Sequence, residues 1–197
     1  MAVAEIQIAN STTTPISPST SLDSPTPLPF TDPSRPMSEQ IVYYYFLTPA
    51  ENPLPEGSVV IMPDTYILAP TLSDTTYSPD TAADLWMGVE AALHDGRNGW
   101  ISSDVEIIGV TFREGHADVV LKGEYFGVGD VTLIAARMQI LMTVFANASV
   151  QTATVTLNGD TIGNIGISHS INAKPADYVF TRPEIETFMN ENAYVSP

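Results

Sequence analysis

The sequence contains no cysteine and few basic residues. The missing cysteine excludes disulfide bonds, thiolate zinc sites, cysteine nucleophiles and a lipidated cysteine within these residues. Seven Lys and Arg residues stand against 23 Asp and Glu residues, which gives a formal net charge of −16 at pH 7. Such a surface repels DNA and RNA, and it disfavours binding to an anionic membrane surface. We therefore expect no nucleic-acid partner.

Long apolar runs are also missing. No stretch of 18 apolar residues occurs, so we expect no membrane span in this chain. The first ten residues, MAVAEIQIAN, have no basic region and too short an apolar run for a signal peptide. Two localisations remain open. The protein is extracytoplasmic and membrane-tethered through a leader that lies outside this sequence, or it is cytoplasmic.

Three regions follow from the composition along the chain. Residues 1–40 are rich in Ser, Thr and Pro, which predicts a disordered linker. Residues 41–170 are expected to form one domain, opened by the apolar and aromatic strand IVYYYFL. The segments VVIMP and TYILAP are weaker strand candidates. Residues 171–197 are expected to form a tail, in which the capping box Thr181-Arg-Pro-Glu184 opens a short helix.

Two helices are predicted within the domain. Ser78 is the expected N-cap of the first, with Pro79 at its first position and apolar residues at helical spacing as far as Leu93. The second has an apolar stripe between Asp130, the expected N-cap, and Asn147, which is expected to end the helix in the left-handed conformation.

The predicted strands lie around the second helix. Val105–Phe112 and His116–Lys122 alternate in polarity and are joined by a short turn containing Gly115, which indicates a hairpin. Val150–Leu157 alternates in the same way and ends in Asn158-Gly159, a strong type I′ turn signal. The predicted fold is α+β: a small sheet, made of the hairpin and flanking strands, packed against two helices.

The order of these elements resembles that of the GerMN domain of sporulation and spore-germination proteins, over about residues 41–167. The resemblance is carried by IVYYYFL, by DLWMGVEAAL, by ISSDVEIIGVTFREGHADVVL and by LIAARMQILMTVFANASVQTATVTLNG. It implies a fold similar to the ring-building modules of sporulation complexes. It also implies an extracytoplasmic domain, often part of a lipoprotein, that acts in envelope assembly or germination. No enzymatic activity follows from it.

Few residues suggest chemistry. His116 and Asp118 share one face of a strand, as a metal or acid/base pair would require. A third ligand would have to come from Glu106, Glu124 or His94. No other motif points to a metal or to a cofactor, and we expect neither.

Two sets of residues are candidates for binding. Trp100 is expected to pack in the core, and it would form a platform for a glycan or peptide if it were exposed. Thr152, Thr154 and Thr156 form an outward-facing row on the strand before Asn158, where a partner would be sought.

Three functions remain open at this point. The first is a non-catalytic assembly or interaction domain of the cell envelope, related to sporulation or germination. Such a domain would bind a protein partner, and oligomer formation is compatible with it. The second is a module that binds cell-wall glycan or peptide through Trp100. The third is a metal-assisted hydrolase around His116 and Asp118. The first predicts a leader and a lipobox cysteine upstream of Met1 in the gene.

Overall fold

The computed structural model describes residues 41–49, 57–62, 66–76, 80–100, 103–126, 129–165 and 173–193. The predicted linker, residues 1–40, lies outside the described residues, as do Ser78 and Pro79.

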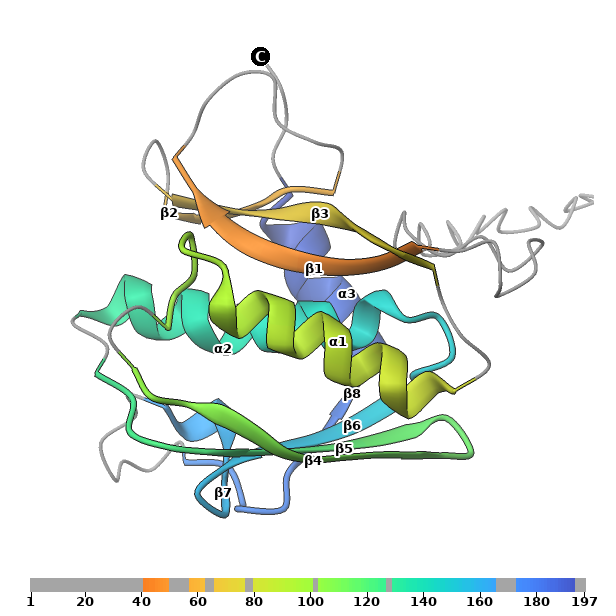
Figure 1. Cartoon of the computed structure of the whole chain (residues 1–197). Coiled ribbons are helices and arrows are strands. Elements are labelled where there is room, and N and C mark those ends of the chain that lie inside the picture. The colour runs from red at the N-terminus through yellow and green to blue at the C-terminus, as the bar shows by residue number, and fades with distance from the viewer. Residues whose placement is uncertain are drawn as a thin grey trace, which may run out of the picture.

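The described elements form three layers (Figure 1). Two helices lie side by side in the middle, between two sheets. These helices are α1 (Thr81–His94) and α2 (Asp130–Ala146). A third helix, α3 (Arg182–Glu191), packs against α2 at one side. The α+β class predicted from the sequence is confirmed, and the structure adds a second sheet to it.

Sheet A has three antiparallel strands in the order β1-β3-β2. They are β1 (Ile41–Thr48), β2 (Val59–Met62) and β3 (Tyr66–Thr76). The two weaker strand candidates are therefore confirmed as β2 and β3. Both α1 and α2 contact β1, so the opening strand covers the helices on the side away from the hairpin.

Sheet B has five strands in the order β4-β5-β6-β7, with β8 paired to β6. They are β4 (Glu106–Arg113), β5 (His116–Lys122), β6 (Thr152–Leu157), β7 (Asp160–Thr161) and β8 (Val179–Thr181), with a short 3-10 helix (Ile162–Asn164) after β7. Strands β5 and β6 are parallel, and α2 is the connection between them.

Both predicted hairpin turns are confirmed. Glu114 and Gly115 have φ of 49° and 82° between β4 and β5, and Asn158 and Gly159 have φ of 54° and 83° between β6 and β7. Positive φ at both central residues is typical of the type I′ turn, whose twist matches that of the strands it joins.

The start of α1 differs from the prediction. Asp80 is the N-cap, because its carboxylate accepts hydrogen bonds from the amides of Ala82 (3.1 Å) and Ala83 (3.2 Å). A carboxylate also interacts favourably with the positive end of the helix. At α3 the prediction holds: Thr181 is the N-cap and accepts from the Glu184 amide at 3.4 Å.

Both predicted ends of α2 are wrong in detail. The N-cap is Gly129 (φ 87°), a conformation that favours glycine, and Asp130 is the first helical residue. Asn147 ends the helix in an extended conformation (φ −74°, ψ 117°) and is not left-handed. Its backbone carbonyl accepts a hydrogen bond from Arg182 at 2.6 Å, which ties the end of α2 to the start of α3.

Helix α2 is buried on nearly all sides because a sheet lies on each side of it. Residues 138–146 are all buried, including the polar Gln139 and Thr143. A surface helix would show a polar face instead. The core residues of both sheets and of α1 and α2 belong to one hydrophobic cluster.

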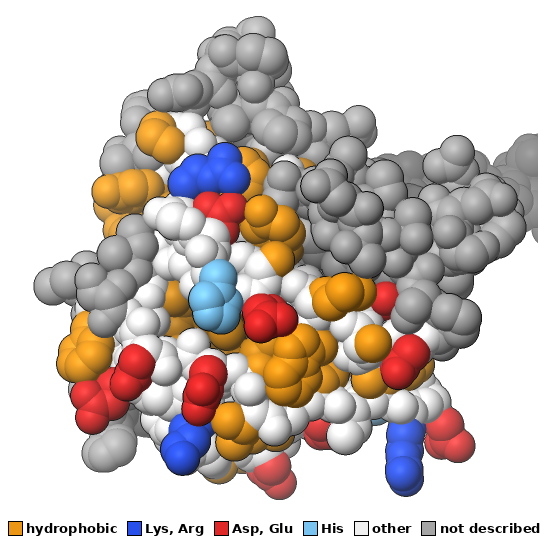
Figure 2. Space-filling view, in the orientation of Figure 1, with side chains coloured by type: hydrophobic (Ala, Val, Ile, Leu, Met, Phe, Trp, Pro, Cys, Tyr) orange, Lys and Arg blue, Asp and Glu red, His pale blue; other side chains and the backbone are white. Residues whose placement is uncertain are grey.

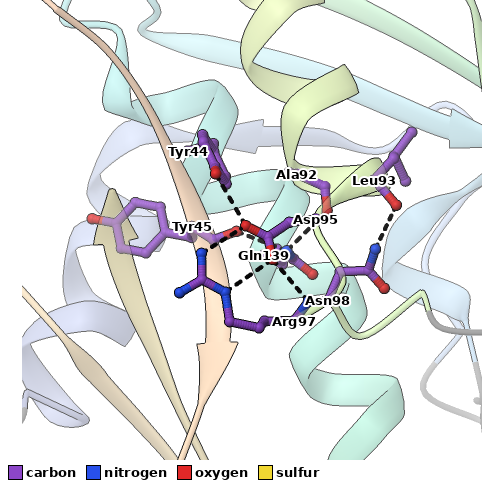
Figure 3. Close-up of polar contacts among 8 residues, drawn as sticks. All are labelled: Tyr44, Tyr45, Ala92, Leu93, Asp95, Arg97, Asn98 and Gln139. Atoms are coloured by element: carbon purple, nitrogen blue, oxygen red, sulfur yellow. Dashed lines mark hydrogen bonds and ion pairs between the residues drawn. The ribbon is translucent and has the colours of Figure 1, made fainter. Parts of the chain in front are cut away.

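Gln139 joins three elements in the middle of this core (Figure 3). Its side chain is fully buried, and its Nε2 donates to the carbonyls of Tyr45 on β1 (2.7 Å) and Ala92 on α1 (3.1 Å). Its Oε1 accepts from the Gly99 amide at 3.0 Å. All three bonds go to backbone groups that the sheet and helix ladders leave unused, so Gln139 stabilises the junction of β1, α1 and the following loop.

A second set of polar contacts lies at the edge of this junction (Figure 3). Arg97 donates to both oxygens of Asp95, at 3.0 and 2.9 Å, and Tyr44 donates to the same carboxylate at 3.0 Å. The hydrogen bond from Arg97 holds the pKa of Asp95 below its usual value, although burial acts in the opposite direction. The Arg97 guanidinium also lies over the Phe46 ring, 3.9 Å from its centroid.

The chain after the predicted domain returns to both sheets. Strand β8 pairs with β6 in sheet B, and α3 follows it directly. At the other end of α3, the Asn192 carbonyl accepts from the Val60 amide at 2.8 Å, and Ala193 bridges to Val59 in sheet A. Helix α3 therefore links the two sheets along one side of the helical layer (Figure 1).

Candidate functional site

The outer face of sheet B brings together five of the residues singled out in the sequence. His116, Asp118, Thr152, Thr154 and Thr156 all point away from the helices, since the alternate positions on β5 and β6 are buried. The parallel register pairs His116 with Thr152 and Asp118 with Thr154. Side chains in such register lie next to each other across the strands.

These side chains form a hydrogen-bonded network across three strands. His116 Nδ1 lies 2.8 Å from Thr152 Oγ1, and its Nε2 lies 3.3 Å from both Asp118 Oδ1 and Thr154 Oγ1. Thr111 on β4 donates to Asp118 Oδ2 at 3.3 Å. The imidazole is therefore held by a carboxylate and two hydroxyl groups, and the side chains of His116 and Asp118 are both partly exposed to solvent.

A third metal ligand beside this pair would have to come from Glu106, Glu124 or His94. Within the stretches that the structure describes, no three His, Cys, Asp or Glu side chains are placed to hold a metal ion. Glu106, Glu124 and His94 therefore do not complete a set with His116 and Asp118. The ring of His94 lies 2.9 Å from the Glu90 carbonyl on α1.

Trp100 lies in the core, which confirms the expected packing, and the exposure that a binding platform would require is absent. It is 2% exposed, and its ring packs edge-on against Tyr125 with 4.9 Å between centroids. The loop that contains Trp100 lies close to α2, because Gly99 packs directly against the backbone of Ala136. The tryptophan at the surface is Trp86 on α1, which is 37% exposed.

A pocket that the sequence analysis missed lies between α2, α3 and the segment after β7. Its volume is about 280 Å³. Apolar side chains form most of its lining, together with the backbone of Gly163: Met138, Leu141, Phe180, Ile185 and Phe188. Three charged residues, Arg137, Lys174 and Glu184, complete the wall. Two of the seven basic residues of this acidic chain therefore line one pocket.

Lys174 is firmly held at the wall of this pocket. Its backbone amide and carbonyl both pair with the Asn164 side chain, at 2.8 and 2.9 Å. Its ammonium group donates to Glu184 Oε1 at 3.0 Å and lies 3.4 Å from the centroid of the Tyr178 ring. Burial lowers the pKa of Lys174, but the hydrogen bonds with Tyr178 and Glu184 outweigh it and the pKa is raised.

Arg137 has a different environment. It is half-buried on α2, and burial lowers the pKa of its guanidinium, which remains a cation at neutral pH. Its one hydrogen bond to a described residue is a long one, from Nη1 to the Gly163 carbonyl at 3.4 Å. No carboxylate of a described residue lies within ion-pair distance of it.

The face of the molecule on which α1 lies is different in charge from this pocket. Acidic side chains outnumber basic ones on the face where α1 lies (Figure 2). None of the helices in the described part of the chain is long and apolar enough to cross a membrane.

Comparison of the chain with protein-family models, with characterised proteins and with solved structures finds no match.

Proposed function

We propose that this chain is a non-catalytic interaction domain of an envelope-associated assembly, related to sporulation or germination. The observation that carries the interaction role is the outer face of sheet B, and the link to the envelope and to sporulation or germination is supported by the resemblance of the sequence to the GerMN domain. Both α1 and α2 lie on the opposite side of this sheet, and no described helix or strand covers the outer face (Figure 1). In this proposal the open face binds a protein partner.

The composition of this face suits a protein interface. Beside the hydrogen-bonded network, Val120 on β5 is 36% exposed and Val179 on β8 is 44% exposed. Val179 is paired in register with Thr154, so an apolar group and a hydroxyl group alternate across the strands. Mixed polar and apolar surfaces of this kind are typical of protein interfaces.

The network also lowers the entropy cost of binding. The ring of His116 and the carboxylate of Asp118 are already held by neighbouring hydroxyl groups before a partner arrives. Immobilising a free, rotamer-rich side chain at an interface costs about 0.5–1.5 kcal/mol. A face whose side chains are fixed in advance avoids part of this cost.

Site-specific photo-crosslinking tests the proposal. A photoreactive residue is placed at Thr154, and a matched one is placed at Glu90, which is exposed on α1. We expect a discrete cross-linked protein species from position 154 and not from position 90, recovered with the cell envelope. The same species from both positions, or none from position 154, would show that this face is not the interface.

Cell fractionation tests the proposed location separately. The proposal places the domain outside the cytoplasm, tethered to the membrane by a leader and spaced from it by residues 1–40. Recovery of the protein with the cytoplasmic fraction, in cells expressing the natural reading frame, would contradict this part of the proposal.

A metal-assisted reaction is the second candidate, because His116 and Asp118 do lie in contact. Metal analysis of the purified protein and of His116→Ala distinguishes it from the first. A stoichiometric metal ion that disappears in the variant would favour this candidate.

A further inference from the structure

The pocket between α2 and α3 has an unbalanced charge. Of its three charged side chains, Lys174 and Glu184 form an ion pair at 3.0 Å and neutralise each other. Arg137 has no carboxylate partner among the described residues. The lining therefore carries one excess positive charge, in a chain whose formal net charge is −16.

The position of Arg137 suits the recognition of an anion. A half-buried guanidinium without a counter-ion loses part of its hydration and gains no compensating ion pair. Its planar donors match the two oxygens of a carboxylate, and such bidentate pairs are among the stronger hydrogen bonds in proteins. Its single described bond, 3.4 Å long, leaves most of these donors available.

The other walls restrict what accompanies the carboxylate. The apolar lining, from Met138 and Leu141 to Phe180, Ile185 and Phe188, requires an apolar body. A volume of about 280 Å³ is slightly below the roughly 300–1,000 Å³ of pockets for drug-sized ligands, so the body must be small.

Glu184 adds a further requirement. Its two oxygens accept hydrogen bonds from Lys174 and Tyr178. A carboxylate has about four acceptor positions, so Glu184 retains capacity for an N–H group of a ligand. A fatty acid has no such group, whereas the last residue of a peptide has an amide N–H beside its carboxylate.

We infer that this pocket binds the C-terminal residue of a peptide or protein when the side chain of that residue is apolar. Arg137 binds the terminal carboxylate, Glu184 accepts from the amide, and the apolar lining holds the side chain. Because this site lies at the helical layer and uses none of the residues of the outer face of sheet B, the inference does not depend on the proposed function.

Titration of the full chain with N-acetyl-leucine, followed by two-dimensional amide NMR, tests this inference. We expect saturable shifts at Gly163, Phe180 and Ile185, with a dissociation constant on the order of a millimolar for so small a ligand. N-acetyl-leucinamide has the same body without the charge, and we expect it to bind at least ten-fold more weakly. Hexanoate has the carboxylate without the amide, and we expect it to bind more weakly than N-acetyl-leucine.

Two variants and a control locate the site. Arg137→Gln is expected to weaken N-acetyl-leucine at least ten-fold. Gly163→Ala keeps every charge but places a Cβ 3.0 Å from Lys174 Cδ and 3.2 Å from Phe180 Cζ, so it narrows the pocket and is expected to weaken binding too. Lys122→Gln removes an exposed charge outside the pocket and is expected to bind normally.

Three results would overturn the inference. They are equal binding of the acid and the amide, unchanged affinity in a folded Arg137→Gln variant, and tighter binding of hexanoate than of N-acetyl-leucine. The amide spectrum of each variant shows whether it is folded, so a loss of binding cannot be confused with unfolding.

Discussion

Two polar residues, two positions apart on α2, have opposite relations to the protein around them. Gln139 is fully buried and makes three hydrogen bonds to backbone groups of β1, α1 and the next loop. Arg137 lines a pocket and makes one long hydrogen bond, to Gly163. Both residues lie among apolar neighbours in the middle of α2. The fold uses both the amide nitrogen and the amide oxygen of Gln139, but few of the donors of Arg137.

This difference separates a structural role from a binding role. A buried polar group that is fully hydrogen-bonded specifies how the elements around it pack, and its removal leaves its partners unsatisfied. A half-buried cation without a counter-ion gains no ion pair in the fold to offset its lost hydration, so its removal does not weaken the fold, and its donors are available to a ligand. We therefore expect substitutions of Gln139 and of the residues that contact it to lower the free energy of unfolding strongly, and substitution of Arg137 to change it little.

Gln139→Met gives the largest expected effect. The substitution keeps the length of the side chain but leaves the carbonyls of Tyr45 and Ala92 and the amide of Gly99 without their partner. Each unsatisfied buried group costs about 1–3 kcal/mol, so we expect a loss of about 3 kcal/mol or more in the free energy of unfolding. Urea denaturation followed by circular dichroism measures it. Gln151→Met, at an exposed position, is the matched control and should change stability by less than about 0.5 kcal/mol.

Gly99→Ala comes next, because it forces apart the loop and helix that Gln139 joins. A Cβ at this position would lie 2.7 Å from the backbone nitrogen of Ala136 and 2.8 Å from its Cα. Overpacking against backbone of this kind costs about 1–3 kcal/mol. Gly96→Ala is the control, since a Cβ there meets nothing within 4 Å. Equal stability of the two variants in urea would mean that the loop does not pack closely on α2.

Asp95→Asn tests the polar contacts at the edge of the same junction, because it removes the charge that Arg97 pairs with. We expect the free energy of unfolding at pH 7 to fall by only about 1 kcal/mol, because Arg97 is more than half exposed and solvent screens its charge. The pKa of Asp95 is lowered in the folded protein, so its contribution is present above the usual aspartate pKa of about 3.9 and is lost as pH falls through the lower folded value. The stability difference between wild type and variant should therefore shrink below about pH 4. A difference that stayed constant down to pH 2, with Asp177→Asn as control, would contradict this assignment.

Arg137→Met gives the smallest expected effect on stability. No described carboxylate loses a partner, and the apolar side chain suits the lining of the pocket. We expect the free energy of unfolding to change by less than about 0.5 kcal/mol. A loss of about 2 kcal/mol in thermal or urea unfolding would show that Arg137 has a structural partner.

Local patterns predicted the elements of the fold well. The alternation of β4 and β5, the Asn158-Gly159 turn and the Thr181 cap depend on neighbouring residues alone, and the structure contains all three. The placement of β1 is different. The sequence predicts a buried strand at IVYYYFL, but strand pairing between distant segments decides that it lies in a second sheet, across the helices from the hairpin.

The caps show a second limit of local patterns. Asp80 and Ser78 are both good N-caps by residue type, and the position of the first helical turn decides between them. The left-handed end expected at Asn147 is replaced by an extended one, where Arg182, 35 residues later, binds its carbonyl. Such a contact cannot be inferred from the residues next to the helix end.

For the candidate sites too, local patterns predicted some features, and others depend on contacts between distant segments. Strand parity placed His116 and Asp118 on one face and Thr152, Thr154 and Thr156 on another outward face, and the parallel register that makes these one surface came from the structure. The pocket was missed because its wall combines α2, α3 and the chain near Gly163. One signal was present: an arginine in the middle of an apolar helix.

The most direct test is a side-by-side urea unfolding of Gln139→Met and Arg137→Met in one buffer at pH 7. We expect the Gln139 variant to be less stable than the Arg137 variant by about 3 kcal/mol. A difference below about 1 kcal/mol, or one of opposite sign, would contradict the claim that α2 carries one polar residue for the fold and one for a ligand.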